Sequence, residues 1–462
     1  MKSNRVKNIV IFLLVILLIY QTVRLWFMDI SNHNLFSTFL PNTLELSNVN
    51  IEQPFHCPYR VIYNPGSGEF KITYQGIKDK IKLYGFYDIL KSPQALSFEE
   101  SGPIDLSNAL ERRSFIYQYN FTMDTGLFLS SFGKTKRNEL SRFDSFDTII
   151  ISPDREIINT VTIYFIDSEN NMSYKYSSVI KNSLYEQVNS YLDEGNDFSG
   201  MLYESSALKK WPIFSENVFY PKWGESGFEY SPLEISNPYF NSNGKEDFVN
   251  IRQQTYVFFD NPVINNSSPF PDTGETQGFL YSDNGQKAVR YYLQNKHMLE
   301  YTNFGDFSSY KKTTVCEDYN SAIRFVENDP YIINDFYLSS YAPEDNQTVF
   351  YFDYAINDFK IEVSNQMDIA HHIEVTVENG MVVSYKKLVL NYSGLKPLGS
   401  ITTTCEELVM DLQKNEQEGL VIENIELVYI ATAKNGQEAF DNLYLNWGVK
   451  PFGKNVTITR PA

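Results

Sequence analysis

Cysteine and histidine are scarce in this chain of 462 residues, which contains three cysteines and five histidines. Cys57, Cys316 and Cys405 are too few to form a disulfide framework for a chain of this size. The sequence also lacks a glycine-rich phosphate loop, a zincin helix, a nucleophile elbow and a calcium-binding loop. These absences exclude a small disulfide-stapled domain and leave no signature of the common catalytic classes.

Only one long apolar run is present, and it lies near the amino terminus. It extends from Ile9 to Met28 and follows Lys2, Arg5 and Lys7. About 20 helical residues span the ~30 Å hydrocarbon core of a bilayer, and flanking cations keep that end in the cytoplasm. We therefore predict a cytoplasmic tail (1–8), a single transmembrane anchor (9–28) and an extracytoplasmic remainder at the cell membrane.

A cleaved signal peptide is the alternative interpretation of this run. Cleavage needs small residues after the apolar core, and the stretch from Gln21 to Trp26 offers none. The retained helix has one stripe at helical spacing that is a candidate contact for a partner's membrane helix, because packing and interhelical hydrogen bonds drive association in lipid. The stripe consists of Leu13, Ile16, Leu17, Tyr20 and Arg24. Snorkelling of Arg24 to the headgroups is the alternative explanation of that residue.

The remaining chain is rich in apolar residues and acidic overall. Hydrophobic residues make up 42% and aromatic residues 15%, and the formal charge is −18. Such a chain can bury real cores, whereas its negative surface repels phosphate backbones. We expect no nucleic-acid partner.

Strand patterns dominate, with a few amphipathic helices between them. Residues 59–74 and 160–177 are typical of β-hairpins, and Val179–Leu192 has the apolar spacing of a helix. We assign residues 30–207 to a first extracytoplasmic α+β domain.

The later half contains an internal repeat of roughly 90 residues. Each copy has an aromatic segment, then a hairpin, then a threonine-capped helix that yields to a strand. The aromatic segments are Thr255–Asp260, Thr348–Asp353 and Asp441–Asn446; the hairpins are 289–304 and 373–388. The fold class expected is α+β: an anchor and three extracytoplasmic domains, the last two (208–335 and 336–462) similar tandem modules with antiparallel sheets.

The two helix starts have the same form. Thr314 with Glu317 fits a capping box, and in the second copy either Thr403 with Glu406 or Thr404 with Glu407 fits it. Cys316 and Cys405 occupy equivalent positions at these starts. A helix start can lower the pKa of a thiol, but packing of a small apolar side chain is the interpretation we favour.

Few residues offer catalytic or metal-binding chemistry. His56-Cys57 and His371-His372 are the candidate metal ligands, but neighbours on a strand point to opposite faces. Glu99-Glu100 is a candidate carboxylate pair for sugar cleavage, although neighbouring carboxylates in a polar stretch are more often solvated. No acid, base and nucleophile converge. We expect no metal, no cofactor and no enzymatic activity.

Taken together, the chain resembles the YycH regulatory proteins of Gram-positive bacteria. The resemblance rests on the anchor and on three segments. The end of the chain, near Trp447-Gly448-Val449, agrees with the family as well. The segments are Tyr291–Tyr301 (YYLQNKHMLEY), Tyr351–Ile361 (YFDYAINDFKI) and Ile373–Tyr385 (IEVTVENGMVVSY). It covers nearly the whole chain.

The resemblance implies a non-catalytic regulator. YycH-type proteins, with a YycI companion, modulate the sensor histidine kinase YycG of a two-component system for cell-wall metabolism, through contacts of transmembrane helices. The aromatic strands offer candidate interface residues for such a companion, with burial in the core as the commoner alternative: Tyr351, Phe352, Tyr354 and Trp447. The alternative function is an extracytoplasmic wall-modifying hydrolase or sugar-binding protein.

Overall fold

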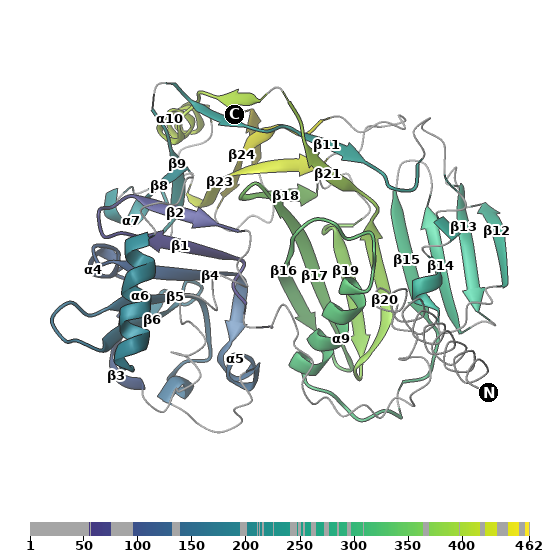
Figure 1. The fold of residues 1–462 in the computed structure, drawn as a ribbon, viewed down its shortest axis with the longest axis horizontal. Helices are drawn as coiled ribbons and strands as arrows, with labels where there is room; N and C mark the ends of the chain where they lie inside the picture. Colours follow the sequence, from purple (N-terminus) through teal and green to yellow (C-terminus); the bar gives the residue numbers. More distant parts are fainter. Residues whose placement is uncertain are drawn as a thin grey trace, which may run out of the picture. The chain divides into compact units, whose positions relative to one another are not determined.

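The computed structural model shows a mixed α+β fold built mostly from antiparallel sheets (Figure 1). It describes residues 55, 57–74, 96–131, 139–194, 201–209, 211, 213–214, 217–224, 226–240, 247, 251–252, 255–259, 265–271, 277–283, 286–292, 297–307, 309–363, 369–396, 398–415, 421–431, 442–451 and 458–461. In this part of the chain no helix combines the length and the apolar character needed to cross a bilayer. The predicted anchor at 9–28 lies outside the described residues.

The first half forms a nine-stranded sheet with the order β3-β7-β6-β5-β4-β1-β2-β8-β9. Its strands are β1 (Arg60–Asn64), β2 (Phe70–Thr73), β3 (Leu96–Pro103), β4 (Ser114–Asp124), β5 (Ser145–Pro153), β6 (Thr160–Asp167), β7 (Met172–Val179), β8 (Leu202–Ser205) and β9 (Phe219–Lys222). Helical segments accompany it: α4 (Ser107–Leu110), α5 (Thr125–Ser131), α6 (Asn182–Glu194), α7 (Ser206–Lys209) and the 3-10 turn η2 (Glu139–Arg142). Both predicted hairpins, β1-β2 and β6-β7, and the predicted helix α6 are confirmed.

The turn between β1 and β2 follows from its residues. Gly66 and Gly68 have φ angles of +80° and +84°, which glycine adopts without steric cost. The Asn64 side chain accepts a hydrogen bond from the Gly66 amide at 2.8 Å and donates to Leu110 O and Arg112 O. Asn64 thereby fixes this hairpin against the start of β4.

The second half forms a twelve-stranded sheet with the path β12-β13-β14-β15-β20-β19-β17-β18-β23-β24-β25, and β16 pairs with β17 off this path. Its strands are β12 (Asn265–Pro271), β13 (Gln277–Asp283), β14 (Lys287–Tyr292), β15 (Met298–Asn303), β16 (Phe336–Pro343), β17 (Gln347–Ile356), β18 (Phe359–Val363), β19 (Ile373–Glu378), β20 (Met381–Leu388), β23 (Ile422–Ala431), β24 (Leu445–Pro451) and β25 (Ile458–Pro461). Two small sheets pair β10 (Phe228–Tyr230) with β22 (Gly399–Ile401) and β11 (Leu233–Ser236) with β21 (Asn391–Gly394). Only β18 and β23 pair in parallel among the named strands.

The element order predicted for the repeat is present. Hairpins β14-β15 and β19-β20 are each followed by a helix, α9 (Val315–Glu327) and α10 (Cys405–Asn415), and then by a strand, β16 and β23. β15 pairs with β20, so the two hairpins lie side by side in one sheet. Helix α9 packs against β17, β19 and β20 (Figure 1). The boundaries 208–335 and 336–462 stay a prediction, since α9 and the strands that it covers come from the two sides of that division.

One predicted equivalence is wrong. The first aromatic segment forms a 3-10 turn, η4 (Tyr256–Phe258), whereas the second lies in β17. The ring of Phe258 packs against Tyr301, Phe325 and Tyr385 at centroid distances of 5.6 to 5.8 Å. A buried aromatic ring in this core can therefore come from a turn as well as from a strand. For this reason the aromatic pattern of the segment did not by itself predict its secondary structure.

The two helix caps explain where α9 and α10 begin. Thr314 and Glu317 form a complete capping box, with Glu317 N to Thr314 Oγ1 at 3.3 Å and Thr314 N to Glu317 Oε2 at 2.8 Å. In the second copy the pair is Thr404 with Glu407, at 3.2 and 2.9 Å.

We expect Thr314→Ala and Thr404→Ala each to lower the free energy of unfolding by about 1 kcal/mol, because each leaves a backbone donor at the helix start without its partner. Urea denaturation followed by circular dichroism measures this loss. Thr402→Ala, an exposed threonine two residues before the second cap, is the matched control and should have little effect. A loss of stability for Thr402→Ala as large as that for the two cap variants would contradict the stabilising role of the caps.

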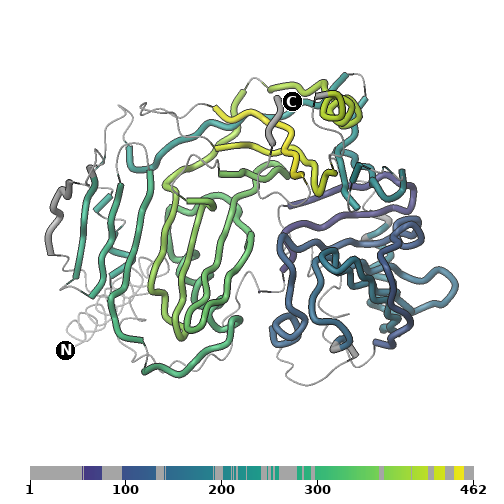
Figure 2. Tube along the Cα trace, turned by 180° about the vertical axis from the view of Figure 1, so that it is seen from behind, coloured from purple at the N-terminus to yellow at the C-terminus, as the bar shows by residue number. Residues whose placement is uncertain are grey.

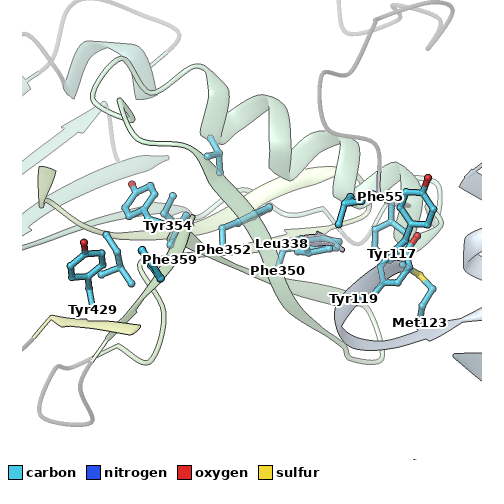
Figure 3. Packing of buried hydrophobic residues seen from close by; sticks show 14 of the residues in the cluster. Phe55, Tyr117, Tyr119, Met123, Leu338, Phe350, Phe352, Tyr354, Phe359 and Tyr429 are labelled. Carbon is cyan, nitrogen blue, oxygen red and sulfur yellow. The ribbon is translucent and has the colours of Figure 1, made fainter. Parts of the chain in front are cut away.

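The core is continuous across both large sheets. Phe55, before β1, packs edge-on against Tyr319 of α9 at 5.3 Å and against Tyr341 of β16 at 5.4 Å. Figure 3 shows Phe350, Phe352 and Tyr354 of β17 in a row between Phe55 and Tyr429 of β23. Residues 51–462 accordingly form one compact unit.

Candidate functional site

A buried charged network joins the first strands of the chain to the last ones. Glu426 on β23 pairs with Arg60 on β1 (3.7 Å) and with Lys360 on β18 (3.1 Å), and accepts a hydrogen bond from Tyr74 Oη at 3.3 Å. Arg60, Lys360 and Glu426 are 5, 7 and 8% exposed. Figures 1 and 2 both show β1 and β2 beside β23.

Further hydrogen bonds join the two large sheets near this network. Asn120 on β4 donates to Ser339 O of β16 at 3.2 Å and accepts from Lys360 Nζ at 3.2 Å. Asp358, in the β17-β18 turn, accepts from the hydroxyl of Thr73 and the amide of Tyr74. The nine-stranded sheet is thus joined to the twelve-stranded sheet by polar groups.

The electrostatics of this network follow from burial and pairing. Burial alone would raise the pKa of Glu426, but the charges of Lys360 and Arg60 and its hydrogen bonds lower it. Lys360 Nζ also lies 4.6 Å from the ring centroid of Tyr59, which is within cation–π range. Glu426 is therefore ionised, and its carboxylate is held by Arg60, Lys360 and Tyr74.

An open cavity of about 1280 Å³ lies over this network. One wall is the face of the first sheet that carries Gln118, Thr148 and Ile166, and the opposite wall comes from β18, β23 and β24. Its aromatic lining includes Tyr59, Trp211 and Phe214. The volume exceeds the range of about 300–1,000 Å³ typical of small-molecule sites.

Two carboxylates at this cavity form no ion pair among the described residues. Asp147 accepts hydrogen bonds from Ser168 N (2.7 Å) and Thr148 Oγ1 (2.7 Å), and Glu169 accepts only a long one, 3.5 Å, from Thr122. Burial raises the pKa of Asp147, and its hydrogen bonds offset this only in part. The cavity lining therefore holds more carboxylates than cations: Asp105, Glu362, Glu423 and Glu426 line it in addition to these two, against Arg60, Lys360 and Lys450.

A second polar cluster surrounds Asp353 on β17. His371 Nδ1 lies 2.7 Å from its Oδ2, and His372 Nδ1 lies 2.8 Å from its Oδ1. The expectation that the two histidines point apart is wrong, because they lie in the bend before β19 and not on a strand. Both rings reach one carboxylate, and His372 Nε2 also lies 3.0 Å from Tyr392 Oη. Even so, neither this cluster nor any other group of three such side chains among the described residues is arranged to hold a metal ion.

This cluster makes the stability of the chain depend on pH. Burial alone would lower the pKa of His371, but the hydrogen bond and charge of Asp353 outweigh it and raise the pKa. A raised folded-state pKa gives stabilisation that is complete below the unfolded value of about 6.5 and is lost as pH rises through the folded value. Loss of this stabilisation should lower Tm as the pH rises above 6.5. We expect His371→Gln to remove this contribution to the fall in Tm, as measured by calorimetry. An unchanged pH profile in the variant would be evidence against it.

The remaining candidates have structural roles. Glu99 and Glu100 both pair with Lys175 on β7, at 3.1 and 3.2 Å, because a bulge in β3 turns the two carboxylates to one side. Burial raises the pKa of Cys316 and of Cys405, so the helix starts do not activate these thiols. His56 lies outside the described residues.

Comparison with known proteins bears on the fold. No family model matches the chain, and no curated protein matches it. The crystal structure of YycH from Bacillus subtilis superposes with a TM-score of 0.53 at 14% identity, covering 90% of this chain and 98% of that one. The chain has a YycH-like fold. The C-terminal domain of YpeB from Bacillus megaterium superposes at a TM-score of only 0.28, with 10% identity over 46% of this chain and 89% of that one.

Within the YycH-like fold, the predicted interface residues differ in exposure. Phe352, Tyr354 and Trp447 are 0, 2 and 0% exposed and belong to the core, whereas Tyr351 is half-buried and lies 4.8 Å from the ring of His371. Any contact with a partner through this set therefore depends on Tyr351. The membrane stripe from Leu13 to Arg24 lies outside the described residues.

The charged network of the YycH-like fold was not found from the sequence. Its members are distant along the chain: Arg60 lies hundreds of residues before the other two, and Lys360 and Glu426 are 66 residues apart. The available signal was a charged residue inside an otherwise apolar strand, as in the buried run Arg60–Asn64. Such a residue is expected to have a buried partner, but the sequence does not say which one.

Proposed function

We propose that this protein is a non-catalytic, single-pass membrane regulator whose extracytoplasmic region modulates a sensor histidine kinase of the YycG type. It acts with a YycI-like companion in the control of cell-wall metabolism. The observation that carries the proposal is the YycH-like fold over 90% of the chain. The apolar run at 9–28 and its flanking cations support the membrane location.

The contact with the kinase is proposed to run through the membrane helix. The stripe Leu13, Ile16, Leu17, Tyr20 and Arg24 offers both a packing surface and hydrogen-bonding groups. The test replaces residues 9–28 by an unrelated spanning helix of the same orientation and measures a kinase-dependent reporter at equal expression. A matched control restores only the five stripe residues in the unrelated helix.

The exchanged anchor should give the reporter output of a strain without the protein, and the restored stripe should return the parental output. Full function with the unrelated helix would show that the anchor only tethers. An output that does not change even when the whole protein is removed would refute the regulatory proposal itself.

The contact with the companion is proposed to include Tyr351. Aromatic residues are favoured in interface cores, and this ring is the accessible one of the four predicted. Tyr351→Ala should weaken crosslinking to the companion in membranes. Tyr444→Ala is the matched control, since Tyr444 is 54% exposed elsewhere on the chain. Equal crosslinking by both variants would remove Tyr351 from the interface.

A second candidate function is an extracytoplasmic hydrolase or sugar-binding protein. The favouring observation is one cavity holding Asp147, with a raised pKa, and Glu426, with a lowered one, as in pairs of acid and ionised carboxylates. Against it, Glu426 is neutralised by two cations. Release of reducing sugars from wall polymer, abolished by Asp147→Asn, would favour this function over the regulator.

A further inference from the structure

We infer that the face of the twelve-stranded sheet opposite helix α9 binds a second copy of this chain, with the two sheets packed face to face about a twofold axis parallel to their strands. The inference goes beyond the proposed function, because it involves neither the kinase nor the companion. It rests on the order of the charges in one row of side chains that crosses the sheet.

Helix α9 covers one face of these strands (Figure 1). Tyr301 of β15 and Tyr385 of β20 point to that face, since their rings pack against Phe325 of α9 at 5.0 and 5.2 Å. Successive side chains on a strand point to opposite faces of the sheet. Glu300 and Lys386, which are the neighbours of these tyrosines and pair with each other in the register, therefore lie on the outer face.

The row that contains Glu300 and Lys386 alternates in charge. It crosses six adjacent strands, β13, β14, β15, β20, β19 and β17, and its four central members carry the charges +, −, + and −. Within one chain Arg290 pairs with Glu300 at 3.3 Å, and Lys386 pairs with Glu374 at 3.9 Å. These four side chains are 42, 18, 37 and 19% exposed in the order of the row. The whole row, called the charged row below, is Leu280, Arg290, Glu300, Lys386, Glu374 and Tyr351.

The charged row is complementary to itself when it is reversed. A twofold axis that runs parallel to the strands, between β15 and β20, turns the second copy face to face with the first and reverses its row. Glu300 of one copy then opposes Lys386 of the other. Arg290 likewise opposes Glu374, and the two apolar ends of the row oppose each other. A twofold axis along the row would oppose like charges, so the row selects one arrangement of the two copies.

The next row on the same face allows the two sheets to approach closely. Its members are all small or β-branched, so no long side chain holds the sheets apart at the ~10 Å spacing of stacked sheets. They are Ala288, Thr302, Ser384, Thr376 and Val349.

The charge of the chain favours this face over the rest of the surface. Two copies with a formal charge of −18 each repel one another through an acidic surface, whereas the charged row has no net charge. Six strands at ~4.8 Å and two rows ~6.6 Å apart cover roughly 400 Å², about half of the ~800 Å² per partner in a standard interface. The dimer is therefore weak, and confinement of both copies to one membrane would raise their effective concentration.

The test uses the full-length protein in lipid vesicles, with separate populations labelled at the carboxyl terminus by a donor or an acceptor fluorophore. We expect energy transfer above the level of random mixing at the same surface density. Lys386→Glu and Glu300→Lys each place like charges together twice in the symmetric dimer. Each alone should therefore raise the apparent dissociation constant at least about tenfold.

Mixing the two variants should restore the energy transfer, because Glu300 and the introduced glutamate of one copy then oppose Lys386 and the introduced lysine of the other. Arg290→Glu mixed with Glu374→Arg should do the same. This second pair decides if Glu300→Lys, which loses contacts to Arg290 and Tyr292, does not fold by circular dichroism.

Lys175→Glu is the matched control, because it makes the same change in net charge on β7 of the nine-stranded sheet, where Lys175 pairs with Glu99 and Glu100. It should leave the energy transfer unchanged, and an equal loss would reduce the effect to net charge and overturn the inference. Random-level transfer by the unchanged protein overturns it, as does full transfer by Lys386→Glu alone, which would place the contact in the anchor or on another face. Failure of the mixed, folded variants to restore transfer overturns it as well. Since no kinase or companion is present, none of these results bears on the proposed function.

Discussion

Replacing Lys387 by methionine is expected to lower the free energy of unfolding by about 3–5 kcal/mol, because it leaves a buried carboxylate without its cation. Lys387 on β20 pairs with Asp329 at 2.5 Å, and their side chains are 1 and 2% exposed. Tyr385 Oη donates to the same carboxylate oxygen at 2.9 Å, which compensates only part of the loss. Urea denaturation, with a check that the slope is unchanged, measures the effect.

The double variant Asp329→Asn with Lys387→Met is the matched control. Removing both charges should cost clearly less than the two single changes added together, because neither partner is then left ionised and alone. Strict additivity would indicate that the two side chains do not interact in the folded protein.

Trp447→Ala is expected to cost a similar amount, about 3–5 kcal/mol, because it empties a large space in the core. Trp447 on β24 is 0% exposed and stacks on Trp223 at a centroid distance of 5.5 Å. Its Nε1 donates to Thr403 O, just before α10, at 3.3 Å. The change should therefore loosen both the last strands and the start of that helix.

Trp447→Phe separates the two contributions of this side chain. It retains most of the apolar ring but loses the hydrogen bond, and we expect a smaller loss of stability than for alanine. Thermal unfolding followed by calorimetry provides the comparison. Equal and negligible effects of both variants would mean that Trp447 is not packed as described, and would reopen its assignment to an interface.

The sequence predicted the local elements well where a local cause exists. The predicted hairpins 59–74 and 373–388 are both present, and their turns need positive φ angles, which Gly66 and Gly68 supply in the first and Asn379 and Gly380 in the second. The capped starts of α9 and α10 depend on side chains three residues apart. Such features are decided by neighbours in the chain, so they can be identified without knowledge of the fold.

Features that depend on distant residues were predicted poorly. The histidines of the Asp353 cluster were assigned to a strand, yet they lie in a bend whose position is decided by β17 and by Tyr392. The Arg60 and Glu426 pair requires the order of strands in both large sheets. Aromatic residues such as Phe352 and Trp447 fit a core and an interface equally well by composition, and only packing distinguishes the two.

The most direct test of the regulatory account is co-purification of the full-length protein from membranes of its own cells after mild crosslinking. The account predicts that a sensor histidine kinase of the YycG type and a YycI-like companion are recovered together with it, and that recovery of the kinase falls when residues 9–28 are exchanged. Recovery of neither protein, with the anchor intact and the protein present at its natural level, would contradict the account.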